Sequence, residues 1–282
     1  MKKKLLIINK QNWHYEIIES VIKKYNDILN ISKDTPIDIY LDIQHENYSF
    51  KLYIKKKYPN IILKYINNYD FFINCTIYDA DFNNIDKNES NKKYIAHEIT
   101  DRLKNNPNVY FLTPLSKSRY FYSDILPFSK KKIKSNIPIY IIQGNLNQGR
   151  RYLKLLTNIL DNNYQYKFII KIVGRGYLPK ELIKYKNKII LKNNLDFIRY
   201  HVEFLNCYCI LPLISKDTHP DYYKNKLTST INYARAYKLK CLIDKDLQNI
   251  YNLDNVQIYN DINDISINFS KTLEQFYNEK NN

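Results

Sequence analysis

Short apolar runs alternate along this chain with longer segments in which apolar residues recur every three or four positions. The run Leu5–Ile8 has the length and composition of a buried strand. The apolar residues that follow it at helical spacing are Trp13, Ile17, Ile18, Val21, Ile22, Tyr25 and Leu29. A strand followed by an amphipathic helix is the repeating unit of α/β domains, so this opening predicts that fold class.

The same alternation continues to the end of the chain and predicts further elements. In the first half the predicted strands are Ile37–Ile43, Ile61–Tyr65, Asp70–Tyr78, Lys93–His97 and Val109–Leu112, with helical stretches near 47–58 and 98–105. In the second half the predicted strands are Ile137–Gln143, Lys167–Val173, Lys188–Leu191, Cys207–Pro212 and Leu239–Ile243. The helices predicted in that half are Arg150–Leu160, Asp196–Leu205, Ser229–Tyr237 and 265–279.

A basic stretch rich in proline separates the two series. Four of the nine prolines lie between 107 and 138, and the segment Ser129–Asn136 among them is poorly periodic. We therefore expect two Rossmann-like domains, at 1–125 and 138–282, joined by a linker at 126–137.

Charge and composition narrow the possible partners. Lys and Arg total 44 against 28 Asp and Glu, a formal net charge of +16, and hydrophobic residues make up 44% of the chain. The apolar content excludes a wholly disordered chain, and the charge favours an anionic partner: nucleic acid, a membrane surface or a phosphate-bearing small molecule. The abundance of residues with A/T-rich codons supports a different explanation, in which the charge is only a solvated lysine coat.

The start of the chain and its cysteines indicate a compartment. The apolar run after the basic start is too short for a signal peptide or a membrane span, so we expect a cytoplasmic protein with no transmembrane segment. The cysteines Cys75, Cys207, Cys209 and Cys241 have no metal-ligand spacing, and we expect them to be reduced core residues.

Two glycine turns give the sharpest chemical signal. The first, IIQGNLNQGRR, follows a predicted strand and leads directly into a helix. Its backbone N–H groups, the helix N-terminus, Arg150 and Arg151 are expected to bind a phosphate or diphosphate. The spacing is neither GxGxxG nor that of a Walker P-loop, which disfavours hydride transfer and P-loop chemistry.

The second glycine turn, IVGRGYLP, follows the next predicted strand. It places Arg175 between Gly174 and Gly176 at the carboxyl end of that strand. Both turns also admit a purely structural interpretation, because glycine is the usual residue of a tight turn.

A third candidate segment is Lys224–Lys238, KNKLTSTINYARAYK. Thr228, Ser229 and Thr230 lie where a loop meets a predicted helix, so their hydroxyls and amides are suited to phosphate oxygens, with Lys226 adding charge. The same residues could equally serve as a plain N-cap of the helix, with no ligand.

These residues resemble a known family. The stretch from about 138 to 270 is similar to the C-terminal, nucleotide-sugar-binding domain of GT-B glycosyltransferases, near the large retaining group that includes glycogen and sucrose synthases. The matching segments are IIQGNLNQGRR, IVGRGYLP, CYCILPLIS and KLTSTINYARAYKLKCLID. The family often carries two glutamates, E-x7-E, where this chain has Asn225 and Tyr233. The composition is similar to that of giant-virus glycosyltransferases.

The resemblance implies GT-B architecture, with two Rossmann-like domains facing across a cleft, the donor in the C-terminal half and the acceptor in the N-terminal half. It implies transfer of a sugar, without metal or other cofactor, from a nucleoside diphosphate sugar (a UDP-sugar is favoured) to a hydroxyl of a glycan or glycoprotein. The catalytic residues would be His97, Arg150 and Lys226. The donor-binding residues would be Gly144, Asn145, Arg151, Gly174, Arg175, Gly176, Tyr177, Leu195, Thr228, Ser229 and Thr230.

His97 ends a predicted strand of the first half, where the resemblance places a histidine that faces the sugar and bonds a hydroxyl or acts as a base. A satisfied structural histidine would give the same local pattern. Weaker candidate contacts are His45, Asn9–Asn12, Asp217, His219 and Asp221.

Two DxD motifs favour a different, metal-dependent interpretation. Asp79–Asp81 and Asp244–Asp246 match the Mn²⁺- or Mg²⁺-binding signature of GT-A glycosyltransferases, although patterns of three residues arise readily by chance. The sequence is also compatible with a nucleotide-sugar epimerase on the same fold, a non-catalytic basic protein that binds nucleic acid, or a catalytically silent scaffold. Peripheral contact with an anionic surface is compatible with the charge.

Overall fold

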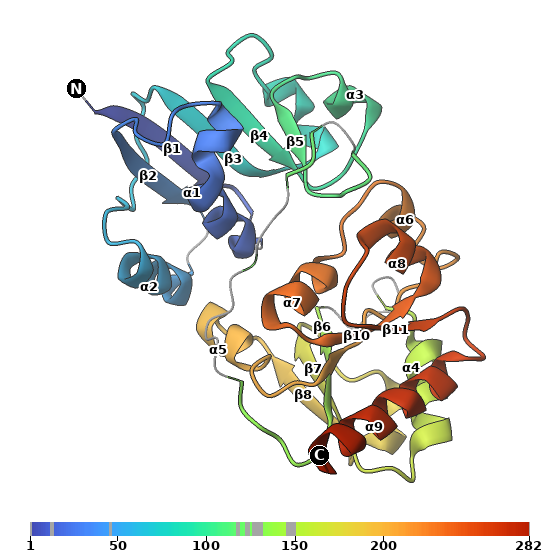
Figure 1. Cartoon of the computed structure of the whole chain (residues 1–282). Helices are drawn as coiled ribbons and strands as arrows, with labels where there is room; N and C mark the ends of the chain where they lie inside the picture. Colours follow the sequence, from blue (N-terminus) through green and yellow to red (C-terminus); the bar gives the residue numbers. More distant parts are fainter. Residues whose placement is uncertain are drawn as a thin grey trace. The chain divides into compact units, whose positions relative to one another are not determined.

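The computed structural model of the chain describes residues 2–11, 14–44, 47–116, 119–121, 125, 132–144 and 151–281. The chain forms two compact units, each built on its own parallel sheet (Figure 1). Unit 1 comprises Met1–Leu126 together with two short segments from later in the chain, Asp196–Ile198 and Asn225–Leu227. Unit 2 comprises Pro127–Leu195, Arg199–Lys224 and Thr228–Asn282.

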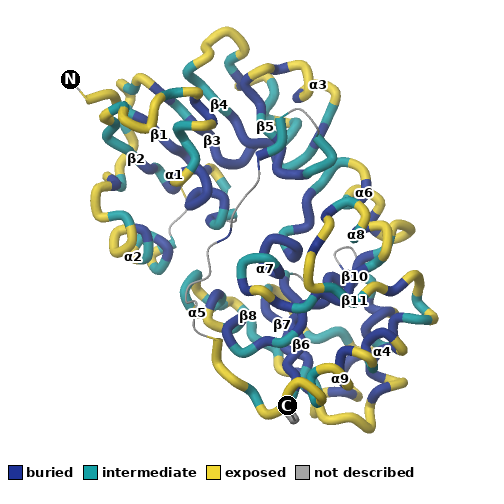
Figure 2. Tube along the Cα trace, viewed as in Figure 1, coloured by how far each residue is buried: buried dark blue, intermediate teal, exposed yellow. Residues whose placement is uncertain are grey.

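The sheet of unit 1 has the strand order β2-β1-β3-β4-β5, with all neighbouring strands parallel. The strands are β1 (Lys3–Asn9), β2 (Ile37–Ile43), β3 (Phe71–Ile77), β4 (Lys92–Ala96) and β5 (Val109–Phe111). The helices of this half are α1 (Tyr15–Leu29), α2 (Tyr48–Lys57), the 3₁₀ helix η1 (Asp79–Asn84) and α3 (Asp101–Lys104). Figure 2 shows the central strands as the most buried part of the unit.

Helix α1 illustrates how the sequence pattern becomes packing. Its apolar stripe, which includes Ile18 and Val21, is fully buried, and the helix packs on β3 and β4. The helix ends at Asn30, whose left-handed backbone lets its N–H bond back to the carbonyls of Asn26 and Asp27.

The sheet of unit 2 has the strand order β11-β10-β9-β6-β7-β8, again with parallel neighbours. The strands are β6 (Ile139–Gln143), β7 (Ile169–Gly174), β8 (Ile189–Asn193), β9 (Cys209–Ile210), β10 (Lys240–Asp244) and β11 (Val256–Tyr259). Counted within the unit, this is the order 3-2-1-4-5-6 of doubly wound nucleotide-binding folds. The expectation of two Rossmann-like parallel sheets is confirmed.

The helices of the second half are α4 (Leu153–Asn163), η2 (Lys180–Tyr185), α5 (Phe197–Val202), α6 (Asp221–Lys224), α7 (Ser229–Tyr237), α8 (Lys245–Tyr251) and α9 (Ile265–Asn281). Helices α4 and α9 pack against each other and share the main core of unit 2. In that core the Tyr140 and Phe269 ring centroids are 4.3 Å apart, and the Tyr140 hydroxyl lies 2.7 Å from Thr272 Oγ1.

Two predicted strands differ most from the structure, and the helix predicted from Arg150 begins only at Leu153. Ile61–Tyr65 does not form a strand: Ile62 makes a single bridge to Tyr40 at the edge beyond β2, and the Lys64 N–H then turns back to the Ile62 carbonyl. The predicted strand Cys207–Pro212 is only two residues long in the structure, Cys209–Ile210, and Pro212, which has no N–H to donate, cannot extend it. In the described part of the chain, no helix is both long and apolar enough to cross a membrane.

Candidate functional site

The strand order of unit 2 reverses between β6 and β9, which lie side by side. Open α/β sheets bind ligands at the carboxyl ends of the strands that flank such a reversal. Here those ends are followed by Gly144, after β6, and by Leu211–Leu213, after β9. This edge of the sheet is therefore where a ligand site is expected from topology alone.

Two glycine turns touch each other at this edge. Gly144 has φ +98°, and its N–H donates to the Val173 carbonyl at 2.8 Å. A Cβ at Gly174 would overlap the carbonyl oxygen of Gly144 and lie 2.5 Å from its carbonyl carbon. At Gly174 the ends of β6 and β7 therefore pack backbone against backbone, which only glycine allows. A Cβ at Gly144 would instead lie 3.0 Å from Nη2 of the Arg151 guanidinium.

The rest of the second turn is held by one side chain of β8. Gly176 has φ +112°, and its carbonyl accepts a hydrogen bond from Asn193 Nδ2 at 2.6 Å. Arg175 and Tyr177 on either side are exposed, Tyr177 to 90%. Leu195, the other predicted contact here, is half-buried.

Gln143 links the end of β6 to the start of α7. Its Nε2 donates to Ser229 Oγ at 3.2 Å, and the Thr230 hydroxyl donates to its Oε1 at 2.9 Å. Gln143 and Thr230 are both buried, whereas Ser229 is half-exposed. The buried Thr228 directs its N–H to the Tyr251 hydroxyl at 3.4 Å. Sequence reasoning missed Gln143, whose two partners lie in a distant part of the chain.

Arg151 lies beneath the first glycine turn. Its side chain is 6% exposed and donates to the Gln143 carbonyl. The next residue, Tyr152, donates its N–H to the carbonyl of Leu213 at 2.7 Å, and Leu213 has φ +51°. The residues at the ends of β6 and β9 are thus both hydrogen-bonded to residues just before α4. One of these bonds comes from the buried guanidinium of Arg151.

Several predicted residues lie outside the described part of the chain. Arg150 and Asn145 are among them, as are Gly149, Asn12 and His45. Their roles stay predictions.

His97 follows β4 at the carboxyl edge of the unit 1 sheet, and its N–H donates to the Ile77 carbonyl at 3.2 Å. Its ring centroid lies 4.7 Å from that of His14 and 5.6 Å from that of Tyr78. His14 Nδ1 is 3.1 Å from Glu16 Oε1. Sequence reasoning missed His14, although it follows β1 at the same edge of a parallel sheet. Two imidazoles and a carboxylate therefore gather in unit 1.

Lys226 belongs to unit 1, with the segment Asn225–Leu227. Its Nζ is 3.3 Å from Glu98 Oε2, and the adjacent backbone bonds through Ile99 N–H to the Asn225 carbonyl at 2.9 Å. The structure thus brings Lys226 next to the residue that follows His97, whereas Ser229 and Thr230 belong to unit 2.

The aspartates of the first DxD motif make local contacts. Asp79 accepts from the Thr100 hydroxyl and from Arg102 at 3.3 Å, while Asp81 accepts from the Tyr78 N–H at 2.8 Å.

The second motif caps a helix. Asp244 accepts from the N–H groups of Asp246 and Leu247 at 3.0 and 3.2 Å, and burial raises the pKa of its carboxyl. Asp246 is 3.2 Å from Lys216 Nζ. Among the residues that the structure describes, no three His, Cys, Asp or Glu side chains are grouped as a metal ion would need.

No protein-family model and no curated protein matches the chain. Solved structures match it over nearly its whole length. AviGT4, a glycosyltransferase involved in avilamycin A biosynthesis, has a TM-score of 0.59 at 8% identity, covering 95% of this chain and 88% of that one. HepE from Anabaena, in complex with UDP-glucose, has a TM-score of 0.57 at 10% identity, covering 98% and 91%.

A third match is the UDP-GlcNAc 2-epimerase of Methanocaldococcus jannaschii, in complex with UDP-GlcNAc and UDP. Its TM-score is 0.51 at 11% identity, and the match covers 97% of this chain and 93% of that one. Likenesses at such low identity show the fold. The chain has the GT-B fold, with two Rossmann-like units.

Proposed function

We propose that the chain is a glycosyltransferase that moves a sugar from a nucleoside diphosphate sugar, with a UDP-sugar as the favoured donor, to a hydroxyl of a glycan or glycoprotein. The observation that carries this proposal is the backbone contact between Gly144 and Gly174, with the start of α7 linked to the same edge through Gln143. Glycine main chain next to a buried guanidinium and a helix N-terminus, at a strand reversal, suits a diphosphate.

The start of α7 supplies the electrostatics for a leaving diphosphate. The helix has nine residues and no acidic residue in its first turn, so its positive dipole end is not offset there. Ser229 provides a half-exposed hydroxyl. The Thr230 hydroxyl holds the Gln143 side chain in place by donating to its Oε1. In this proposal the buried Arg151, with Arg150 and Lys226, stabilises negative charge that develops on the diphosphate, and no metal ion is needed.

The nucleobase is assigned to the second turn and to the segment after β8. The hydrogen bond from Asn193 to the Gly176 carbonyl holds these two segments together. The exposed Arg175 and Tyr177 and the half-buried Leu195 then offer stacking and hydrogen-bonding surfaces for a base.

His97 is assigned to the acceptor side of the reaction. In the proposal it orients or deprotonates the acceptor hydroxyl, while the ring of His14, which contacts Glu16, packs against its ring in unit 1.

A nucleotide-sugar epimerase is the second candidate, because an epimerase is among the proteins that share the fold. The two activities differ in whether an acceptor is required. Incubation with UDP-glucose and with UDP-GlcNAc separates them: release of UDP that depends on an added glycan supports transfer, whereas epimer formed without acceptor supports the epimerase.

Binding of the donor nucleotide is tested first by a thermal-shift panel of UDP, GDP, TDP, CDP, ADP and NAD, each with Mn²⁺ and with EDTA. A ligand at a hundred times its Kd stabilises the folded chain by about 2.7 kcal/mol, which raises Tm by several degrees. A shift with one nucleoside diphosphate in EDTA supports the proposal, and a shift only with Mn²⁺ contradicts metal independence. A flat panel, with binding to nucleic acid that weakens steeply with salt, contradicts the proposal as a whole.

A further inference from the structure

Unit 1 contains a cavity of about 240 Å³ that is not part of the carboxyl-edge sites. It is lined by residues of β3 and β4 and of the connection between them, together with Lys10 after β1 and Tyr69 before β3. That connection forms the short helix η1 and then a loop whose polar side chains bond to their own backbone: Asp86 Oδ1 accepts from the N–H groups of Asn88 and Glu89 at 3.0 and 3.2 Å. A short 3₁₀ helix covers less of a sheet face than a full α-helix does, and the hollow lies beside it.

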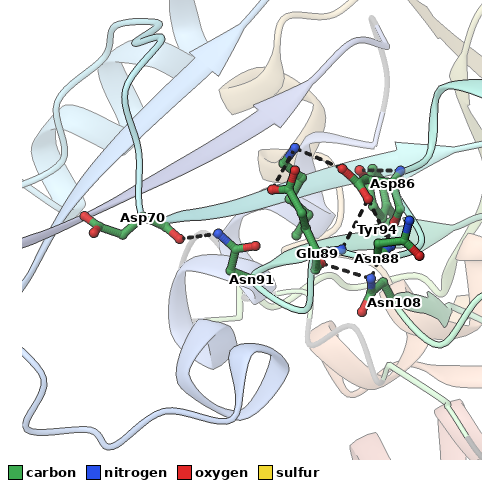
Figure 3. Close-up of polar contacts among 8 residues, drawn as sticks. Asp70, Asp86, Asn88, Glu89, Asn91, Tyr94 and Asn108 are labelled. Carbon is green, nitrogen blue, oxygen red and sulfur yellow. Dashed lines mark hydrogen bonds and ion pairs between the residues drawn. The ribbon is translucent and has the colours of Figure 1, made fainter.

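One wall of the cavity is held by a network of polar contacts (Figure 3). The Asp86 N–H donates to the Tyr94 hydroxyl at 3.1 Å, and Asn108 Nδ2 donates to the Glu89 carbonyl at 3.0 Å. Lys92 Nζ lies 3.2 Å from Asp86 Oδ2 and 3.0 Å from Glu89 Oε2. Since this wall is already ordered, a ligand binding there has little ordering cost to overcome.

The floor of the cavity carries a side-chain amide. Asn74 lies within β3, is only 6% exposed and lines the cavity. Its Oδ1 accepts from the Thr76 N–H at 3.3 Å, and its Nδ2 is a hydrogen-bond donor in the cavity lining. An acceptor atom of a ligand in the cavity can therefore take a hydrogen bond from this amide.

The remaining lining defines the chemistry of the ligand. Three aromatic rings run along the cavity, with the Phe72 centroid 5.5 Å from that of Tyr69 and 5.8 Å from that of Tyr94. Such rings pack against C–H groups, while amides and carboxylates bond to hydroxyls.

The charges of the lining balance. Lys10 and Lys92 are opposed by Asp81 and Asp86, in contrast to the net charge of +16 of the whole chain. This balance favours an uncharged ligand over a phosphate. The volume lies below the range of about 300–1,000 Å³ that holds drug-sized ligands. We propose that this cavity binds one uncharged sugar unit, at a site separate from the donor site of unit 2.

The test measures binding of methyl glycosides of glucose, galactose, mannose and N-acetylglucosamine to the full chain by calorimetry. Asn84 lies exposed at the rim, so N84W fills the cavity without disturbing the ordered wall. N67W places the same side chain at an exposed position outside the cavity and is the matched control. N74D removes the amide donor at the floor, with its fold checked by circular dichroism.

We expect saturable binding of at least one glycoside that falls at least tenfold in N84W and N74D and is unchanged in N67W. Saturating UDP must leave that binding unchanged: where UDP binds, this arm separates the cavity from the proposed donor site, and where it does not, the N84W variant locates the glycoside. Absence of binding by every glycoside, binding that survives N84W, displacement by UDP, or binding of inorganic phosphate in place of a glycoside overturns the proposal.

Discussion

Gly174 tolerates a side chain less well than any other glycine at the strand ends of unit 2 that the structure describes. A Cβ there meets main-chain atoms of Gly144, which cannot move aside as the end of a flexible side chain would. Gly176 differs: a Cβ at that position meets nothing within 4 Å, and only its φ of +112° opposes substitution. Substitution of Gly174 therefore tests steric crowding, and substitution of Gly176 tests backbone strain, within the same turn.

We expect G174A to lower the free energy of unfolding by about 3 kcal/mol, because overpacking against rigid backbone is not relieved by rotamer changes. G176A is expected to cost about 1–2 kcal/mol, the penalty of a positive φ alone. Urea denaturation measures both. Equal losses in the two variants would show that the contact between the turns is not tight.

At the proposed donor site, charge removal is expected to affect turnover more than folding. R150A and K226A should each lower kcat about a hundredfold, as loss of a group that stabilises a developing anion does. K154A, which removes an exposed lysine of α4, is the control and should leave kcat unchanged. Unchanged turnover in both R150A and K226A, measured by release of the nucleoside diphosphate, would remove them from the site.

At the scale of elements, Gln143 joins the end of β6 to the first turn of α7 by two side-chain hydrogen bonds. The position of that helix N-terminus relative to the glycine turns depends on this link. A comparable bond elsewhere in unit 2 joins Gln257 of β11 to Asn268 of α9 at 2.8 Å.

Q143M is expected to weaken binding of the nucleoside diphosphate about tenfold, equivalent to about 1.4 kcal/mol, because the start of α7 is no longer held against β6. Q257M removes a bond of the same chemistry away from the site, so its nucleotide affinity should be that of the unaltered chain. Titration calorimetry compares the two. Equal nucleotide affinities for Q143M and Q257M would show that the bonds from Gln143 to the start of α7 do not support nucleotide binding.

The strands that the sequence predicts best are those whose apolar runs are continuous. Leu5–Ile8 and the residues of β6 are buried on both faces of their sheets, so every position carries the same signal. The ends of β9 are harder to predict because Pro212 and the positive φ of Leu213 stop the pairing inside an apolar run. Local pattern does not report where pairing stops.

At the candidate site too, local features of the sequence were predictable, whereas contacts between distant segments were not. The predicted placement of Gly144 and Gly174 at strand ends is confirmed, since a turn after a strand is a local feature. Their mutual contact, the partners of Gln143, and the pairing of His14 with His97 depend on which strands lie side by side. No single segment of the sequence contains that information.

At the scale of the whole molecule, the buried phenols and thiols set a limit at alkaline pH. Of the 28 tyrosines, Tyr140 and Tyr259 are almost completely enclosed, and burial raises the pKa of both. Burial also raises the pKa of Cys207 and Cys209 to about 12. The described cysteines are all buried and free, in agreement with the expected core role.

Each of these groups holds its proton more tightly in the folded chain than in the unfolded chain. Their contribution to stability is complete below the unfolded pKa values, about 8.5 for Cys and about 10 for Tyr, and is lost as pH rises above them. We expect the free energy of unfolding to fall steadily from about pH 9 upward. Exposed tyrosines ionise first, and the phenolate absorbance of the buried ones should rise only as the circular dichroism is lost. Full tyrosine ionisation near pH 10 in a chain that keeps its circular dichroism would contradict this expectation.

The assignment of Asp196–Ile198 and Asn225–Leu227 to unit 1 limits how the protein can be taken apart. Phe197 packs on Phe50 and Tyr53, with ring centroids 4.8 and 5.2 Å away, although it is encoded far beyond the main boundary at 126/127. Division of the chain at 126/127 gives an N-terminal fragment that lacks Phe197. It also gives a C-terminal fragment in which the Phe197 ring has lost Phe50 and Tyr53, the rings on which it packs. A chimaera that exchanges residues 1–126 for those of another protein must therefore also exchange these two segments, and fragments expressed separately should recover solubility only when produced together.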